Sequence, residues 1–181
     1  MREARTPVTL TLGNKALRGL WGLVWLLLYR PSPRLLHGWR RLLLRLFGAT
    51  IGAGAHPYPS ARIWAPWNLE MAPRSCLAQG VDCYNVARVT LGADVVVSQY
   101  AYLCTASHDA DAADFPLVAA PISVGRKAWI GADAFVGPGV RIAEGAVIGA
   151  RATLFADVEA GQIVVGSPAR HLRDRAEAGW R

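Results

Sequence analysis

Histidines are the first residues in this chain that could move a proton, and there are four of them: His37, His56, His108 and His171. His37 lies in a basic segment and His171 in the tail, so both are expected to be solvated. His108 stands where a polar stretch, residues 107–122, interrupts a regular repeat. An imidazole that titrates near neutrality and faces a cleft is a good general base. We therefore take His108 as the candidate base.

Other chemistries have weaker support in the sequence. Zinc requires three or more protein ligands, and only one histidine is well placed. The three cysteines, Cys76, Cys83 and Cys104, are odd in number and lack CxxC spacing, which argues against a disulfide framework or a zinc site. The glycines do not form a phosphate-binding loop between a strand and a helix. We expect no metal, and cysteine usage fits a reducing cytoplasm, with Cys83 as a small buried hydrophobe.

A six-residue repeat supplies the scaffold that must position His108. Branched aliphatic residues recur at every sixth position, mostly followed by Gly: Val124, Ile130, Val136, Ile142, Ile148 and Leu154. A helix repeats its apolar face near 3.6 residues and a strand near 2, so a strict six means short flat runs separated by sharp corners. This pattern is typical of a parallel β-helix. An antiparallel sandwich would show period-two alternation and scattered turn lengths instead.

The same phase extends backwards through the chain and shows where the chain leaves the prism. The earlier inward positions are 51, 57 and 63, then 71, 77 and 83, then 91, 97 and 103. The longer gaps, from 63 to 71, from 83 to 91 and from 103 to 124, all follow the third hexapeptide of a coil. All the extra residues therefore leave from one edge. We predict an all-β protein of about five to six coils.

Stacking of the coils identifies candidate partners for His108. Neighbouring coils lie about 4.8 Å apart, which puts Cys83 beneath Leu103 and Asn85 beneath Thr105. Asn85 then shares a face and an edge with His108 and is a candidate for binding substrate, with Asp82 as the weaker candidate. Asn85 is equally well explained as a turn residue at an insertion. Asp109 could orient His108, although adjacent side chains normally diverge.

Positive charge is confined to the N-terminal segment. The chain carries a formal charge of +7, but residues 1–48 hold nine Lys or Arg and one acidic residue, giving +8. The remaining residues hold eleven basic and twelve acidic side chains, giving −1. A nucleic-acid groove requires a basic stripe on the folded body, so we expect no nucleic acid partner.

The N-terminal segment predicts two helices. The apolar stretch Ala16 to Tyr29 is shorter than the roughly 20 residues of a bilayer span, and no cleavage site of a signal peptide follows it. Ser32 predicts the N-cap of a second helix that ends at Gly48. This helix is expected to place these residues on one face: Leu35, Leu36, Trp39, Leu42, Leu43 and Leu46. Residues 16–47 could contact an anionic membrane or cap the first coil, and the two roles are compatible.

These elements divide the chain into three parts. Residues 1–48 form the basic helical segment, 49–168 the β-helix with the loop 107–122, and 169–181 the tail. In the tail we expect a short helix from about Leu172 to Ala178.

Four stretches resemble a known family: residues 25–34, 102–109, 128–132 and 166–170. The chain resembles the hexapeptide-repeat acyltransferases with a left-handed parallel β-helix over about residues 10 to 173. Within that family it is similar to the colanic-acid-type O-acetyltransferases of exopolysaccharide biosynthesis, which are related to galactoside and maltose acetyltransferases.

The resemblance implies acetyl-CoA as the donor and a homotrimer with active sites between subunits. It implies that His108 deprotonates a sugar hydroxyl and that Asn85 binds the acceptor. Residues at positions where the family contacts CoA are Trp129, Ala132, Ala150 and Arg170. The chain departs from the family at Phe155-Ala156, where a Thr-Lys pair usually touches the cofactor.

The expected function is therefore acetyl-CoA-dependent O-acetylation of a sugar hydroxyl in extracellular polysaccharide biosynthesis, by direct transfer. The acceptor is expected to be a sugar or a lipid-linked oligosaccharide, and the protein cytoplasmic, with peripheral contact at the inner face of the cell membrane. Two alternatives remain open: O-acetylation of a free small sugar, and a non-catalytic scaffold at the membrane.

Overall fold

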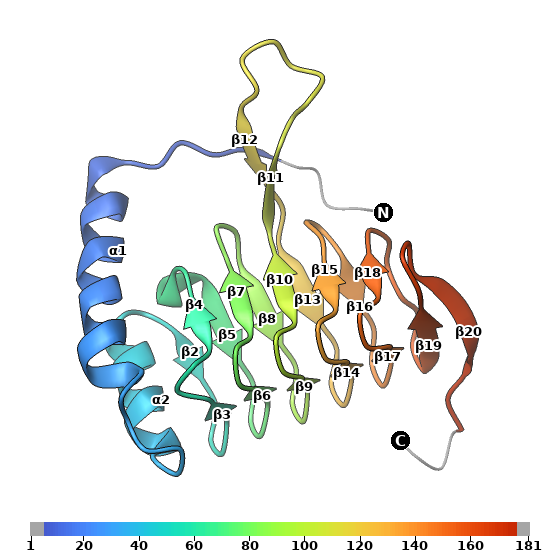
Figure 1. The fold of residues 1–181 in the computed structure, drawn as a ribbon, viewed down its shortest axis with the longest axis horizontal. Helices are drawn as coiled ribbons and strands as arrows, with labels where there is room; N and C mark the ends of the chain where they lie inside the picture. The colour runs from blue at the N-terminus through green and yellow to red at the C-terminus, as the bar shows by residue number, and fades with distance from the viewer. Residues whose placement is uncertain (1–5, 177–181) are drawn as a thin grey trace.

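The structure, a computed structural model, describes residues 6–176, and its body is a prism of stacked coils (Figure 1). The first face holds β2 (Thr50–Ile51), β5 (Leu69–Met71), β8 (Val89–Leu91), β13 (Ile122–Val124) and β16 (Arg141–Ile142). The second holds β3 (His56–Pro57), β6 (Cys76–Leu77), β9 (Val96–Val97), β14 (Trp129–Ile130), β17 (Val147–Ile148) and β19 (Gln162–Val165). The third holds β4 (Arg62–Ile63), β7 (Asp82–Tyr84), β10 (Tyr102–Cys104), β15 (Phe135–Val136) and β18 (Thr153–Leu154).

These strands are parallel within each face, so the predicted parallel β-helix is confirmed. The predicted inward positions are buried, and Cys83 pairs with Leu103 as the stacking required. Corners are tight because small residues occupy them: a Cβ on Gly125 would lie 2.5 Å from the backbone nitrogen of Glu144 in the next coil. The aliphatic side chains from all coils form one apolar cluster along the prism axis, which supplies the main driving force for folding.

The three insertions leave from one edge of the prism, as predicted. A 3₁₀ turn, Pro66–Asn68, follows β4, and a short turn follows β7. After β10 the chain forms a hairpin of β11 (Ala106–His108) and β12 (Leu117–Ala119), to which β1 (Thr6–Pro7) adds a third antiparallel strand. The hairpin projects from the prism, whereas the other turns stay close to it (Figure 1).

Two helices cover the N-terminal end of the prism. α1 (Leu12–Val24) continues into a π-helical turn, Trp25–Tyr29, and α2 (His37–Leu46) follows. The prediction that Ser32 caps the second helix is wrong, because α2 begins five residues later and its N-cap is Leu36. The Ser32 hydroxyl is occupied elsewhere: it donates to the Tyr29 carbonyl and accepts a hydrogen bond from Arg40.

α2 buries a mixed side rather than the whole of its predicted apolar face. Its fully or nearly fully buried residues are Arg40, Leu43 and Leu44, whereas five of the six residues of the predicted apolar face are exposed. Packing against polar backbone explains why an arginine is buried. Carbonyl groups of the second coil accept hydrogen bonds from N–H groups of the first coil. No coil precedes the first, so its own carbonyls have no such donors.

Side chains of the two helices replace that missing coil. Arg40 donates to the Pro57 carbonyl at 2.7 Å, Arg41 to Ala55 at 2.9 Å, and Arg45 to Ile51. The indole nitrogens of Trp21 and Trp25 donate to the carbonyls of Ile63 and Ala61 at 2.7 and 2.9 Å. In the second coil the five equivalent carbonyls accept from backbone N–H groups instead. Residues 16–47 thus cap the solenoid, since an open coil would leave buried polar groups unpaired.

His37, predicted to be solvated, is half-buried in this cap. Its Nδ1 lies 3.2 Å from the Pro57 carbonyl oxygen, and burial lowers the pKa of its imidazole.

The C-terminal end is closed by a strand. β20 (Arg170–Asp174) pairs antiparallel with β19, so the predicted helix from Leu172 is wrong over its described part. Ala178, the predicted end of that helix, lies outside the described residues. Because no further coil follows β19, its edge offers backbone partners to the tail, and pairing with that edge competes successfully with local helix formation.

Candidate active site

His108 lies at the last position of β11, opposite Leu117 of β12, and its side chain is exposed. Three antiparallel strands support this position, since β12 also pairs with β1. The predicted loop 107–122 is therefore a braced hairpin with a short tip. This arrangement holds an imidazole away from the body of the protein, where a substrate can reach it.

Phe115 fixes the orientation of the His108 ring through two contacts. The Nδ1 atom lies 2.8 Å from the Phe115 carbonyl oxygen, and the two rings are stacked with centroids 4.6 Å apart and planes 4° apart. A carbonyl oxygen only accepts, so this bond requires the proton on Nδ1. In the neutral ring Nε2 then carries the free lone pair, as a general base requires.

The backbone of Phe115 is strained to make these contacts. Its φ angle is +45°, in the left-handed region that non-glycine residues rarely adopt. Such strain concentrates at functional sites, where the surrounding structure holds the residue in place.

Asp109 does not orient His108. Its carboxylate accepts the backbone N–H of Asp111 at 3.1 Å, and its own N–H donates to the Pro116 carbonyl. Asp109 therefore shapes the hairpin tip, and the carbonyl of Phe115 orients the imidazole. Phe115 could not be identified from the sequence, because a backbone acceptor has no residue signature.

Asp82 lies on the outer face of β7, on the strand next to the one that leads to His108. It is the neighbour in register of Tyr102 on β10, and Arg62 on β4 is its neighbour on the other side. Burial raises the pKa of the Asp82 carboxyl, and the charge of Arg62 partly offsets this effect. A half-buried carboxylate on an outer face is available to accept hydrogen bonds from a ligand.

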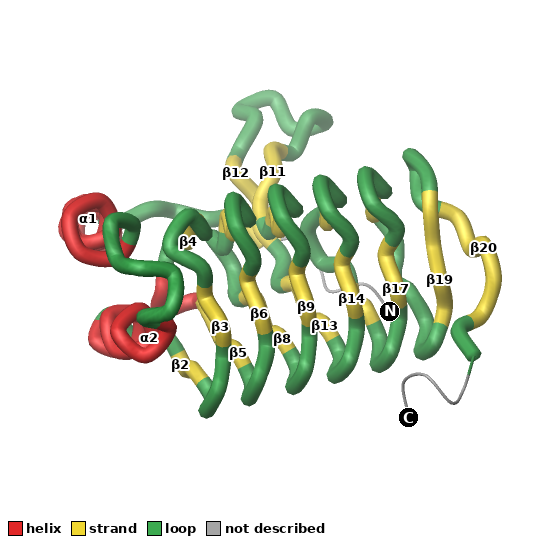
Figure 2. Tube along the Cα trace, turned by 60° about the horizontal axis from the view of Figure 1, so that its bottom comes forward, coloured by secondary structure: helices red, strands yellow, loops and turns green. Residues whose placement is uncertain are grey.

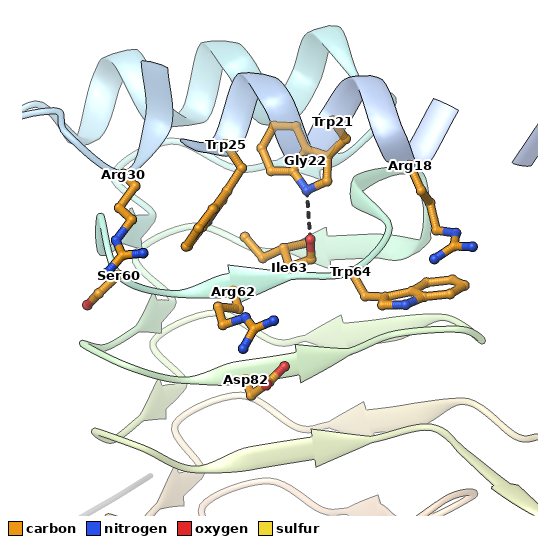
Figure 3. Close-up of a pocket in the computed structure, with 10 residues that line it drawn as sticks. All are labelled: Arg18, Trp21, Gly22, Trp25, Arg30, Ser60, Arg62, Ile63, Trp64 and Asp82. Atoms are coloured by element: carbon orange, nitrogen blue, oxygen red, sulfur yellow. Dashed lines mark hydrogen bonds between the residues drawn. The ribbon is translucent and has the colours of Figure 1, made fainter. Parts of the chain in front are cut away.

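Asp82 also lines a pocket of about 580 Å³ between α1 and the first two coils (Figure 3). The pocket walls combine indole rings with guanidinium groups: Trp21, Trp25, Trp64, Arg18, Arg30 and Arg62. The Arg18 guanidinium lies 4.2 Å above the Trp64 ring, and Arg30 lies 5.3 Å from the Trp25 ring. Aromatic faces with hydrogen-bonding groups around them suit a polar ring such as a sugar.

Sequence reasoning missed every wall residue of this pocket except Asp82. Asp82 precedes the inward-facing Cys83, and Trp64 follows the inward-facing Ile63. Both therefore occupy outward positions of the repeat, and Trp64 could have been identified from its position in the repeat. The arginines of the helices gave no such signal, because the docking of α1 on the first coils decides where they lie.

Asn85 is fully buried and does not face this pocket. Its Oδ1 accepts the Ala65 N–H at 2.9 Å, and its Nδ2 donates to the Ala65 carbonyl at 2.6 Å. Both ends of the amide are therefore engaged with backbone at the edge where the insertions leave. The neighbouring Tyr84 lies at an outward phase of β7 and is half-buried, like Asp82.

The predicted cofactor contacts lie on the C-terminal coils. Trp129 is exposed on β14, and its Nε1 donates to the Ser98 hydroxyl at 2.8 Å. Ala132 and Ala150 occupy corners of successive coils, linked by the Arg151 N–H, which donates to the Ala132 carbonyl at 2.9 Å. Arg170 is exposed at the start of β20. All four lie on the half of the prism away from the helices.

The residue that departs from the family pattern, Phe155, lies in an aromatic column. Its ring centroid is 5.7 Å from that of Phe135, which is 5.5 Å from that of Tyr102. The column runs along the outer side of the third face, past the strand that leads into the His108 hairpin. The position of the usual Thr-Lys pair is thus occupied by packed aromatic surface.

Over residues 6–176 no cluster of three or more His, Cys, Asp or Glu side chains could hold a metal ion. The three cysteines are free, and Cys83 is buried as expected. Within the same residues no helix is long and apolar enough to cross a membrane.

A family model described as bacterial transferase hexapeptide (six repeats) matches residues 121–156. Over 165 residues the chain is 41% identical to WcaF of Escherichia coli (strain K12), which is named for acetyl transfer in colanic acid biosynthesis. The alignment covers 91% of each protein.

Solved structures share the fold. A hexapeptide-repeat acetyltransferase of Vibrio cholerae, complexed with acetyl coenzyme A, aligns with a TM-score of 0.81 and 25% identity over 92% of this chain and 91% of its own. A galactoside acetyltransferase in complex with coenzyme A aligns with a TM-score of 0.84 and 22% identity over 94% of this chain and 86% of its own. The second likeness is one of fold alone.

Proposed function

The chain belongs to the hexapeptide-repeat acetyltransferases with a left-handed parallel β-helix, and on that premise we propose that it O-acetylates a sugar hydroxyl in extracellular polysaccharide biosynthesis. The observation that carries the proposal is His108, exposed on a braced hairpin with Nδ1 bonded to the Phe115 carbonyl. A base held in this tautomer activates a hydroxyl and needs no metal.

Transfer is direct in this proposal. The Nε2 atom of His108 removes the proton of the sugar hydroxyl, whose oxygen attacks the thioester carbonyl of acetyl-CoA. The C–S bond then breaks, and the leaving thiolate takes the proton back from His108. The Phe115 carbonyl stabilises the imidazolium between these steps, since it accepts from Nδ1 in both protonation states. Binding both reactants to one protein removes much of the entropic cost of their meeting.

The acceptor site is the pocket beside α1. Indole faces pack against the apolar side of a sugar ring, and Asp82 and Arg62 offer an acceptor and a donor for its hydroxyls. Asn85 keeps a supporting role in this arrangement: its two bonds to Ala65 hold the corner from which the outward residues of β7 and β4 project.

Acetyl-CoA is the donor, supported by the complex of the Vibrio cholerae relative with acetyl coenzyme A. We assign Trp129, Ala132, Ala150 and Arg170 to CoA, with Phe155 replacing the usual polar contacts. The protein acts as a homotrimer in this proposal. The hairpin projects away from its own prism, so a neighbouring subunit can complete the site around His108 (Figure 1).

The name of the 41% identical relative supports a polysaccharide acceptor rather than a free small sugar. We place the reaction in the cytoplasm at the inner face of the cell membrane, where a lipid-linked oligosaccharide would be the acceptor.

Release of free CoA thiol from acetyl-CoA tests this function. The wild-type protein is supplied in parallel with free sugars and with a lipid-linked oligosaccharide. We expect acceptor-dependent release that is faster with the lipid-linked acceptor. Faster release with a free mono- or disaccharide would favour the small-sugar alternative, and binding of acetyl-CoA without release on any acceptor would favour the scaffold.

A further inference from the structure

The outer sides of the two N-terminal helices carry large apolar side chains without a partner in the described structure. Six of these residues, each between 39% and 71% exposed, define what we call the leucine face: Leu20, Leu23, Leu27, Trp39, Leu42 and Leu46. They recur at intervals of three and four residues, so they lie along one side of each helix. Trp39 joins the two helices, because its Nε1 donates to the Leu28 carbonyl at 3.0 Å.

The three arginines of α2 point the other way. Arg40 is 0% exposed, and Arg40, Arg41 and Arg45 donate to carbonyls of the first coil. An ordinary surface helix buries its leucines and exposes its arginines. The cap has the opposite order. Its helices stand at one end of the prism, and no other element of residues 6–176 lies beyond them (Figures 1 and 2).

Charge selects the occupant of this face. Residues 6–48 contain seven Lys or Arg and no acidic residue. The carbonyl groups to which Arg40, Arg41 and Arg45 donate carry no net charge, so the segment as a whole stays positive although these side chains point away from the leucine face. A second copy of the chain would bring one such segment against another, and like charges would repel. An anionic lipid surface attracts basic segments and accepts apolar side chains at the same time.

We propose that the leucine face binds the surface of an anionic bilayer, with α1 and α2 lying in the plane of the interface. The leucines enter the boundary between headgroups and acyl chains, and neither helix spans the membrane. The opposite side of α1 and of the π-helical turn after it lines the pocket through Arg18, Trp21 and Trp25 (Figure 3). The pocket then opens within roughly one helix diameter, about 10 Å, of the lipid surface.

This placement deepens the proposed function, since an acceptor anchored in the bilayer would reach the pocket without leaving the membrane. Binding to lipid can be measured without any acetyl transfer. Loss of the membrane role and loss of the enzymatic role are therefore separate experimental results.

The test is co-sedimentation of the full-length protein with phosphatidylcholine vesicles that contain phosphatidylglycerol. We expect binding that weakens with added salt and is much weaker on pure phosphatidylcholine. Leu27→Gln should weaken it about fivefold, and Leu20→Gln with Leu23→Gln and Leu27→Gln about a hundredfold, since each leucine loses part of its transfer free energy. These side chains are exposed, so the thermal unfolding midpoint should not fall.

Leu172→Gln is the matched control, because Leu172 on β20 is 59% exposed and Leu27 is 58% exposed. Binding of this control should equal that of wild type. Light scattering on the same samples reports the oligomeric state. The proposal is overturned if wild type does not sediment with anionic vesicles, if the leucine variants bind as well as Leu172→Gln, or if they change only the oligomeric state, in which case a second copy covers the face.

Discussion

Arg40 in the cap of the prism and His108 in the hairpin of the third coil are basic side chains with opposite surroundings. Arg40 in the cap is fully buried, and its guanidinium donates to the carbonyls of Pro57, Pro33 and Arg34 and to the Ser32 hydroxyl. His108 in the hairpin is exposed and has one hydrogen-bond partner in the described structure, the Phe115 carbonyl.

This difference separates stability from chemistry. The Arg40 guanidinium donates to three backbone carbonyls and one hydroxyl within the protein, so removing it leaves these acceptors without that donor and costs folding free energy. In His108 one ring nitrogen bonds the Phe115 carbonyl, and the other has no hydrogen-bond partner in the described structure. The two residues should therefore respond to mutation in opposite ways: one through the free energy of unfolding, the other through the rate of acetyl transfer.

The largest expected effect lies in the hairpin. His108→Ala should lower kcat/KM for acetyl transfer about 10²- to 10⁴-fold, the range for a lost general base. The unfolding midpoint should match that of wild type, because the side chain is exposed. Steady-state CoA release and thermal unfolding on the same preparation check both halves. If His108→Ala also lowered the unfolding midpoint, its loss of activity could come from unfolding, and the contrast with Arg40 would disappear.

The next effect lies in the cap. Arg40→Ala should lower the free energy of unfolding by about 3–5 kcal/mol, because buried carbonyls and the Ser32 hydroxyl lose their donor. Denaturant unfolding measures this loss. Arg74→Ala is the control, since Arg74 makes an exposed ion pair with Asp94 whose loss should leave the unfolding midpoint unchanged. Similar midpoints for the two variants would show that the cap does not depend on Arg40.

A smaller effect is expected at the residue that holds the imidazole. Phe115→Gly keeps the backbone carbonyl and suits the positive φ angle, but it removes the stacked ring. We expect kcat to fall about tenfold with KM nearly unchanged, the scale of one aromatic contact. Phe115→Tyr keeps an aromatic ring at this position and should have the wild-type kcat. A change in KM alone would place Phe115 in substrate binding rather than in positioning His108.

The smallest effect concerns one hydrogen bond of the cap. Trp21→Phe removes the donor to the buried Ile63 carbonyl and should cost about 1 kcal/mol of unfolding free energy. Trp39→Phe removes the exposed bond to the Leu28 carbonyl and should cost less. If Trp39→Phe lost more unfolding free energy than Trp21→Phe, hydrogen bonds to first-coil carbonyls would not be what stabilises the cap.

The sequence predicts the prism and the place of His108, because both depend on the six-residue period. A period fixes which side chains point inward and where insertions leave, and nothing non-local enters that inference. The face of α2 could not be predicted in this way. Arg40 is buried because carbonyls of the first coil lack donors, and that need arises only when the coil has formed.

The other differences have the same origin in tertiary pairing. The tail from Leu172 forms a strand because β19 has an open edge. Asn85 turns inward because the backbone of Ala65 offers both a donor and an acceptor. The pocket around Asp82 depends on how α1 docks, so its arginines and tryptophans were not foreseeable from spacing.

The central claim is that Nε2 of His108 is the base for acetyl transfer, and chemical rescue tests it most directly. Free imidazole is added to His108→Ala, and acceptor-dependent CoA release is followed as its concentration and the pH are varied. The account predicts that release recovers in proportion to unprotonated imidazole, while wild type and Arg40→Ala do not respond. Release from His108→Ala at the wild-type rate without imidazole would contradict it.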